Sequence, residues 1–218
     1  MKREIVMAIE SAIAGGSLAL LVDGKVVQRW HSAESHARGE EHLARAASLI
    51  ELSGIERTQI TRIAVSNGPG SYTGIRIGLA TAMGLARALK VPCTGVGLLT
   101  AMATISAEFK SRIVAVPIGR NGYCWQHFNA HEGDAIGSGP IDDLLAAIAE
   151  RPEAKVVAQS DAYEILSEKL NPADCVRIID HGRDLAVAVG LVSADADDGL
   201  EPFYARDTAI QRPREVSS

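Results

Sequence analysis

The sequence predicts an α/β fold in which part of the strand pairing is parallel. Three observations predict it. A run of strand patterns opens the chain, one strand then leads through a Gly-rich turn into a long apolar helix, and strand and helix patterns alternate afterwards. Such alternation favours a sheet covered by helices. The 218 residues are enough for one large or two small domains with a sizeable core.

The first three strands are expected over residues 4–10, 17–22 and 25–31. The first is a continuous apolar run, which is typical of a buried strand. Asp23 and Gly24 separate the second from the third, and this dipeptide is a strong hairpin signal. We therefore expect three antiparallel strands at the start of the fold.

The most informative stretch is Ser66–Leu89, SNGPGSYTGIRIGLATAMGLARAL. Its tight Gly-Pro-Gly turn follows a short apolar strand and leads directly into a helix. Free backbone N–H groups and the positive end of the helix dipole would then face whatever lies above the turn. A nucleotide or anion near the turn is one interpretation, and a structural role in setting the direction of the helix is the other. The turn residues concerned are Gly68, Gly70 and the two candidate N-caps, Ser71 and Thr73.

The helix after this turn is apolar on nearly all sides, which is unusual for a surface helix. Gly74, Gly78, Ala82 and Ala86 recur at every fourth position and form a nearly smooth row, along which another helix could approach closely. We infer that one face packs on the chain's own sheet and a second face packs on another protein. The helix expected over 37–52 carries its own apolar stripe.

The second half continues the alternation. Strands are expected over 112–118, 123–129, 155–158 and 175–179, and helices over 142–150, 162–169 and 184–194, after a strand at 93–96 and a helix at 98–107. We therefore divide the chain into an N-terminal subdomain, 1–107, and a smaller C-terminal α/β subdomain, 108–218, which ends in a polar tail.

Charge and cysteine usage exclude several classes of protein. The net charge is −5 and no basic patch is evident, so strong direct binding of nucleic acid is not expected. The three cysteines include no Cys-x-x-Cys pair, which argues against a disulfide framework and a structural zinc site and fits a reducing cytoplasm. His36 and His42 are six residues apart, a spacing that does not make a helical metal site. No signal peptide or membrane span is expected.

The Ser66–Leu89 stretch resembles the signature segment of the TsaB family, also called YeaZ. The resemblance is reinforced by the N-terminal hairpin, by Glu41-His42-Leu43 and by Pro202–Arg206. It implies an actin/sugar-kinase-like (ASKHA, ribonuclease H-like) fold of two subdomains, each a mixed sheet with flanking helices. It also implies a cytoplasmic, non-catalytic scaffold of the machinery that makes N6-threonylcarbamoyladenosine at position 37 of tRNAs reading ANN codons.

The family relationship further implies partners. The catalytic subunit TsaD would dimerise with this chain through a two-helix face, the ATPase TsaE would bind near that junction, and tRNA would be contacted only indirectly. A homodimer is expected where TsaD is absent. ATP and metal are expected on the partner subunits, and no cofactor on this chain. The predicted interface comprises Leu43, Ala47, Ile50, Ile75, Gly78, Leu79, Ala82 and Met83.

Two other functions remain open at this stage. A nucleotide-dependent kinase or ATPase of the same fold needs acids facing a metal-bound phosphate, and Glu10 with Asp161 or Asp180 would supply them. The family usually has Asp-Thr-Ser where this chain has Glu10-Ser11-Ala12, so the phosphate-binding hairpin is degenerate. A peptidase would use Ser71 with a histidine base and an acid.

Overall fold

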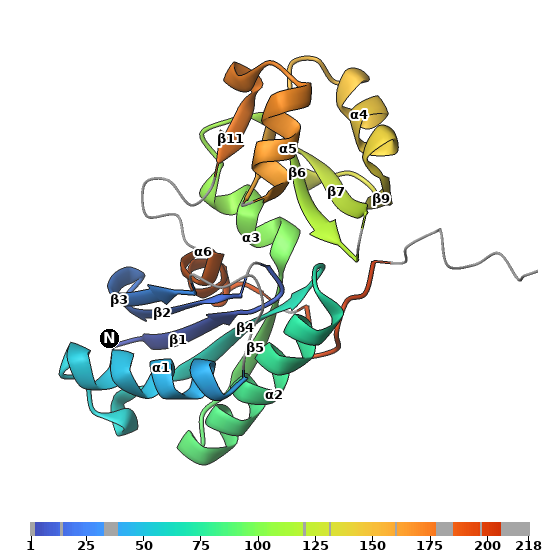
Figure 1. Ribbon diagram of the computed structural model, residues 1–218. Coiled ribbons are helices and arrows are strands. Elements are labelled where there is room, and N and C mark those ends of the chain that lie inside the picture. The colour runs from blue at the N-terminus through green and yellow to red at the C-terminus, as the bar shows by residue number, and fades with distance from the viewer. Residues whose placement is uncertain are drawn as a thin grey trace, which may run out of the picture.

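The computed structural model of the chain describes residues 3–13, 15–32, 39–119, 121–130, 132–159, 161–177, 185–196 and 198–205. Within these residues there are two sheets, and helix α3 (Leu98–Ile105) lies between them (Figure 1). In this part of the chain, no helix has both the length and the apolar character needed to cross a membrane.

The first sheet has the strand order β3-β2-β1-β4-β5. The strands are β1 (Ile5–Glu10), β2 (Ser17–Val22), β3 (Lys25–His31), β4 (Arg62–Gly68) and β5 (Cys93–Gly97). The first three pair antiparallel, as their hairpin signal predicts, whereas β4 and β5 pair in parallel beside β1. The predicted mixture of antiparallel and parallel pairing is therefore present.

Helices cover both faces of this sheet. On one face lie α1 (Gly39–Ser53) and α2 (Tyr72–Leu89), and on the other lie α3 and α6 (Leu185–Val192) (Figure 1). Side chains alternate accordingly along β1, since Met7 shares a core cluster with Leu79 whereas Ala8 shares one with Val189. Every residue of β1 and β2 is buried, as expected for strands covered on both faces.

The second sheet has the order β11-β10-β6-β7-β8, with β9 also paired to β7. Helices α4 and α5 pack on this sheet, and side chains of the helices and of the sheet together form a separate apolar cluster. The elements are β6 (Ser111–Ile118), β7 (Gly122–Asn129), β8 (Glu132–Gly133), β9 (Gly137–Pro140), α4 (Ile141–Ala149), β10 (Lys155–Ala158), α5 (Asp161–Lys169) and β11 (Cys175–Arg177). Two short 3-10 helices, Arg57–Gln59 and Pro172–Asp174, precede β4 and β11.

The last part of the described chain returns to the first sheet. The backbone N–H of Ala186, in α6, donates to Ser17 Oγ at 3.0 Å, and that of Phe203 donates to the carbonyl of Asn67 at 2.8 Å. Asn67 Nδ2 donates to the carbonyl of Asp198 at 3.1 Å. The division predicted from the sequence places this last part of the chain in the second subdomain, yet the residues of α6 complete the core of the first sheet, and residues 198–205 pack against that sheet.

Candidate functional site

The Gly-rich turn between β4 and α2 packs against the residues that follow β1. Gly70 has a φ of 153°, and a Cβ at this position would lie 2.7 Å from both the Cβ and the carbonyl oxygen of Ala12. The backbone N–H of Ser71 donates to the same carbonyl at 2.8 Å. Glycine at position 70 is therefore required by both backbone conformation and space.

Ser71 is the N-cap of α2. Its backbone is extended, with φ −60° and ψ 123°, and its side chain accepts a hydrogen bond from the N–H of Gly74 at 3.2 Å. The cap satisfies one of the free donors of the first turn. Thr73 lies exposed in the same turn. The serine that a peptidase would need as nucleophile thus has a structural role, and proximity of the turn to a nucleotide stays a prediction.

The degenerate hairpin directs its polar groups inward. Glu10 is 1% exposed, and its Oε1 accepts the backbone N–H groups of Ala12 at 2.5 Å and Ile13 at 3.1 Å. Burial raises the pKa of this carboxyl to about 8, against the two hydrogen bonds that lower it. Ser11 is buried and its hydroxyl donates to the carbonyl of Gly74 at 2.7 Å. A largely protonated carboxyl is a poor ligand for the metal ion that accompanies a bound phosphate.

No metal centre is formed by those remaining polar candidates that the structure describes. Among the described residues, no three His, Cys, Asp or Glu side chains gather in a way that could hold a metal ion. His36 and Asp180 lie outside the described residues, as does the side chain of Asp161.

The structure divides the eight predicted interface residues into two groups. Leu43, Ala47 and Met83 are exposed, with Leu43 at 53% and Met83 at 51%. The other five are buried within the chain's own core: Ile50, Ile75, Gly78, Leu79 and Ala82. The assignment of the eight residues to a partner interface stays a prediction.

The burial of Gly78 and Ala82 follows from the direction in which the small-residue row of α2 (Gly74, Gly78, Ala82 and Ala86) faces. A Cβ at Gly74 would collide with the carbonyl oxygen of Ser11, and one at Gly78 with the Ser11 hydroxyl. The row therefore permits α2 to approach the end of β1, and not a partner helix. Gly84, which belongs to a different row, has no atom within 4 Å of a Cβ placed on it.

An apolar groove runs between the outward faces of α1 and α2, which lie side by side on one face of the first sheet (Figure 1). Its volume is about 530 Å³. The residues that line it carry no charge: Gly39, Leu43, Ile77, Ala80, Thr81, Gly84, Leu85 and Ala88. We call this surface the α1–α2 groove. An exposed apolar surface of this kind is typical of a docking site.

Most residues of the α1–α2 groove were missed in the sequence. Ile77, Thr81, Gly84 and Ala88 recur three or four residues apart, which is the spacing of one helix face. This spacing predicts an outward face, but the row of Gly74, Gly78, Ala82 and Ala86 (the Gly78 row) has the same period and contains more small residues. Because α2 is apolar nearly all round, its sequence does not say which row faces outward.

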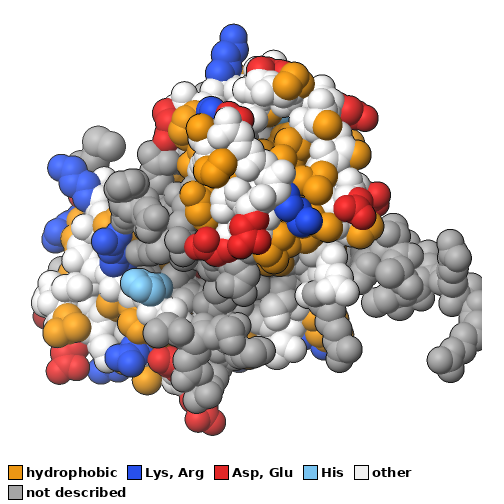
Figure 2. Space-filling model, turned by 45° about the horizontal axis from the view of Figure 1, so that its top comes forward, with side chains coloured by type: hydrophobic (Ala, Val, Ile, Leu, Met, Phe, Trp, Pro, Cys, Tyr) orange, Lys and Arg blue, Asp and Glu red, His pale blue; other side chains and the backbone are white. Residues whose placement is uncertain are grey.

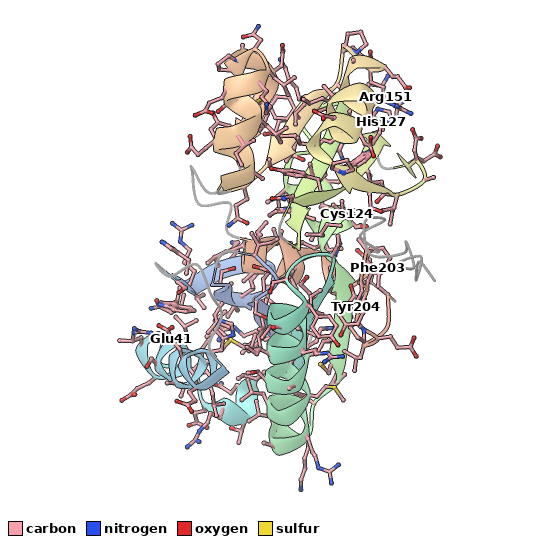
Figure 3. The ribbon with its side chains drawn as sticks, turned by 45° about the vertical axis from the view of Figure 1, so that its right-hand side comes forward. Glu41, Cys124, His127, Arg151, Phe203 and Tyr204 are labelled. Atoms are coloured by element: carbon pink, nitrogen blue, oxygen red, sulfur yellow. The ribbon has the colours of Figure 1, made fainter. Side chains whose placement is uncertain are left out.

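A cluster of aromatic rings and one arginine lies at the start of α2, on the side away from α1 and Glu41 (Figure 3). Arg76 Nε donates to the Tyr204 hydroxyl at 2.8 Å, and its guanidinium carbon lies 3.9 Å from the centre of the Tyr72 ring. The two tyrosine rings are 4.8 Å apart. The C-terminal motif of the resemblance thus contacts the signature helix directly, although its last residue, Arg206, lies outside the described residues.

A cleft of about 360 Å³ opens at the carboxyl ends of β4 and β5. It is lined by Asn67, Gly68 and Asp198, and by the first turn of α3. Asp198 Oδ2 accepts the N–H of Gly97 at 2.9 Å, whereas the buried Oδ1 of Asn67 has no hydrogen-bond partner among the described residues. Ligands of open α/β sheets bind at such strand ends. Gly68 is the predicted turn residue that reaches this cleft.

Comparison with known proteins supports the resemblance. The family model described as "TsaD: tRNA N6-adenosine threonylcarbamoyltransferase" matches residues 33–126. The TsaB protein of Escherichia coli K12 is 36% identical over 102 residues, 45% of this chain and 42% of that protein. TsaB of Bacillus subtilis 168 is 27% identical over 167 residues, 77% of this chain and 68% of that protein. These relatives confirm the resemblance to the TsaB family, although the match spans less than half the length of the Escherichia coli protein.

A solved structure confirms the fold. YeaZ from Pseudomonas aeruginosa superposes with a TM-score of 0.67 and 20% identity, covering 93% of this chain and 100% of that one. The actin/sugar-kinase-like fold expected from the resemblance, with two mixed sheets and flanking helices, is thereby confirmed.

Proposed function

We propose that this chain, a relative of the TsaB proteins, is a non-catalytic scaffold in the formation of N6-threonylcarbamoyladenosine at position 37 of tRNAs reading ANN codons. Its role is to dock on the catalytic subunit TsaD and keep that subunit competent for catalysis. The single observation that carries the proposal is the uncharged, exposed α1–α2 groove on a helix pair that the family resemblance independently assigns to partner binding.

The choice of TsaD as occupant follows from the match to the TsaD family model. That match spans residues 33–126 and so includes all of α1 and α2. A protein of the TsaD family therefore carries a helix pair homologous to this one. Two such pairs can pack face to face around an approximate two-fold axis, as in an isologous dimer. The same geometry allows a second copy of this chain to occupy the groove where TsaD is absent.

The polar groups of the hairpin support a non-catalytic role. The Glu10 carboxyl and the Ser11 hydroxyl both bind backbone groups of the chain itself. ATP and metal are accordingly assigned to the partner subunits, and TsaE to the junction between this chain and TsaD.

Surface charge is consistent with indirect contact to tRNA. The net charge is −5, and acidic and basic side chains are interspersed over the described part of the face drawn in Figure 2. Proteins that grip nucleic acid present clustered Lys and Arg, because neutralising phosphates supplies most of the binding free energy.

The test uses Gly84, a groove position at which a Cβ would meet no atom within 4 Å. Gly84→Leu fills the groove while removing a helix-interior glycine, so it should not destabilise the fold. The matched control, Gly84→Ala, removes the same glycine with almost no added bulk. We expect Gly84→Leu to weaken binding of the full chain to TsaD by at least about tenfold in calorimetry, an interfacial cost of about 1.4 kcal/mol. Unchanged affinity in Gly84→Leu would show that TsaD binds elsewhere.

A further inference from the structure

Three side chains that are far apart in the sequence meet on the second sheet. Ser111 is the first residue of β6, His127 lies in β7, and Asp134 follows β8. The register pairs Ile113 with His127, so Ser111 and His127 are diagonal neighbours on one face of the antiparallel pair. The end of α4 meets this face, and Figure 3 shows Arg151 beside His127.

The contacts follow the order hydroxyl, imidazole, carboxylate. Ser111 Oγ lies 3.1 Å from His127 Nε2, and His127 Nδ1 lies 3.0 Å from Asp134 Oδ2. A carboxylate accepts hydrogen bonds and donates none, so Nδ1 must carry the proton of this contact. In the neutral imidazole, Nε2 is then left with its lone pair directed at the Ser111 hydroxyl. This is the tautomer that a general base for a serine requires.

The carboxylate is held ionised and in place. The hydrogen bond from His127, and then that from Arg151 Nη2 at 3.1 Å, lowers the pKa of Asp134 below its ordinary value. The backbone on either side is also fixed, because the N–H of Asp134 donates to the carbonyl of His127 at 2.9 Å and its carbonyl accepts Gln126 Nε2 at 2.8 Å. The orientation of the His127 imidazole is therefore held both by its contact with the Asp134 carboxylate and by the backbone contacts of Asp134.

The cluster is open to small reagents. The His127 side chain is 14% exposed and that of Asp134 is 51% exposed, while Ser111 is partly buried. Glu153 Oε1, 3.5 Å from Ser111 Oγ, is a more distant acceptor for the same hydroxyl. The nearer acceptor is His127 Nε2, which lies within the distance needed to take the proton of the Ser111 hydroxyl.

We propose that Ser111 is a base-activated nucleophile that takes the acyl group of small carboxylic esters, with His127 as the base and Asp134 as a positioning residue. Ser111 Oγ bonds to the ester carbonyl carbon, and the bond from that carbon to the alkoxy oxygen breaks. The hydroxyl proton passes to His127 Nε2 and from there to the departing alcohol. Water then releases the acid by the same route and restores the serine hydroxyl. The activity is independent of the proposed scaffold role.

The experiment measures which serines of the native full chain react. The chain is treated with a fluorophosphonate probe, which forms an Oγ–P bond and loses fluoride with the serine proton as HF. Mass spectrometry then locates the label. We expect Ser111 to be labelled at least about tenfold faster than Ser48 and Ser167, because base activation contributes about 10²–10⁴-fold to such reactions. Each of those two serines donates its hydroxyl to a nearby helix carbonyl. The same chain should release p-nitrophenolate from p-nitrophenyl acetate and carry an acetyl group on Ser111.

Variants identify the base. His127→Gln should reduce labelling at position 111 by at least about tenfold. Ser111→Ala removes the reacting hydroxyl and should abolish labelling there, whereas Ser48→Ala should leave it unchanged. Asp134→Asn should slow labelling and Asp134→Glu should restore part of the rate, which a purely structural role would not produce. Labelling of wild-type Ser111 no faster than of Ser48 would overturn the proposal without any variant. A Ser111 rate that is unchanged in a folded His127→Gln variant would overturn it equally.

Discussion

The hydroxyl of Ser11 donates to the carbonyl oxygen of Gly74 at 2.7 Å and so joins the end of β1 to the first turn of α2. Gly74 and Gly78 make this approach possible, because a Cβ at either position would collide with Ser11. The small residues of α2 therefore serve the fold of the chain itself. This relationship separates the inward face of α2 from the α1–α2 groove on its outward side.

The first prediction concerns the two faces of α2. Gly78→Ala should reduce the free energy of unfolding by about 1–3 kcal/mol, since the added methyl group has no space beside Ser11. Gly84→Ala, on the open face of the same helix, should increase it by up to about 1 kcal/mol through helix propensity alone. Urea unfolding of both variants measures the difference. Equal changes at the two positions would contradict the assignment of faces.

The second prediction concerns the pH dependence of stability that Glu10 creates. Its pKa is about 8 in the folded chain, against 4.5 for an exposed Glu, so the folded state binds a proton that the unfolded state has released. The contribution of Glu10 to stability is therefore complete below about pH 4.5 and is lost as the pH rises through about 8. The slope is at most about 1.4 kcal/mol per pH unit.

Glu10→Gln keeps the shape of the side chain and an acceptor oxygen but cannot ionise. The stability of the wild type relative to this variant should fall steadily from pH 5 to pH 8, as measured by urea midpoints at each pH. A stability difference that does not change with pH would mean that the carboxyl does not titrate in this range.

The third prediction concerns a buried arginine between the two sheets. Arg112 is 1% exposed, and its guanidinium donates to the carbonyl of Ala103, near the end of α3, and to that of Phe109, both at 2.9 Å. Arg112→Met should cost about 2 kcal/mol or more in chemical denaturation, because it leaves these acceptors without their charged donor. Arg112→Lys should not restore stability, since lysine lacks the planar fork.

A matched arginine provides the control for this substitution. Arg45 lies on the surface of α1 with its side chain 51% exposed, and Arg45→Met should change stability by less than about 0.5 kcal/mol. Comparable effects at the two arginines would show that the buried contacts of Arg112 contribute little.

Much of the fold could be predicted from the sequence, because its signals are local. The Asp23-Gly24 hairpin, the apolar run of β1 and the Ser71 cap each follow from residues close together in the chain. The strands β8 and β9 were not expected, since Glu132–Gly133 and Gly137–Pro140 are short and rich in glycine. Pairing with β7, and not intrinsic propensity, makes them strands.

The candidate sites depend on relationships that no local pattern contains. Two rows of residues on α2, one containing Gly78 and the other Gly84, have the same helical period. Only the packing of Gly78 against Ser11 shows which row faces the sheet. Ser111, His127 and Asp134 show no motif spacing, because strand register and a hydrogen-bonded loop bring them together. Helix α6 packs on the first sheet, and its sequence does not predict this, because an eight-residue apolar helix could pack on either sheet.

The most direct test of the scaffold role is the mass in solution, by light scattering, of the full chain alone and after mixing with TsaD from the same organism. We expect a mixed complex containing one copy of each protein, formed at the expense of any homodimer, because both associations use the α1–α2 groove. A chain that stays monomeric alone and keeps that mass in the presence of TsaD would contradict the proposed function.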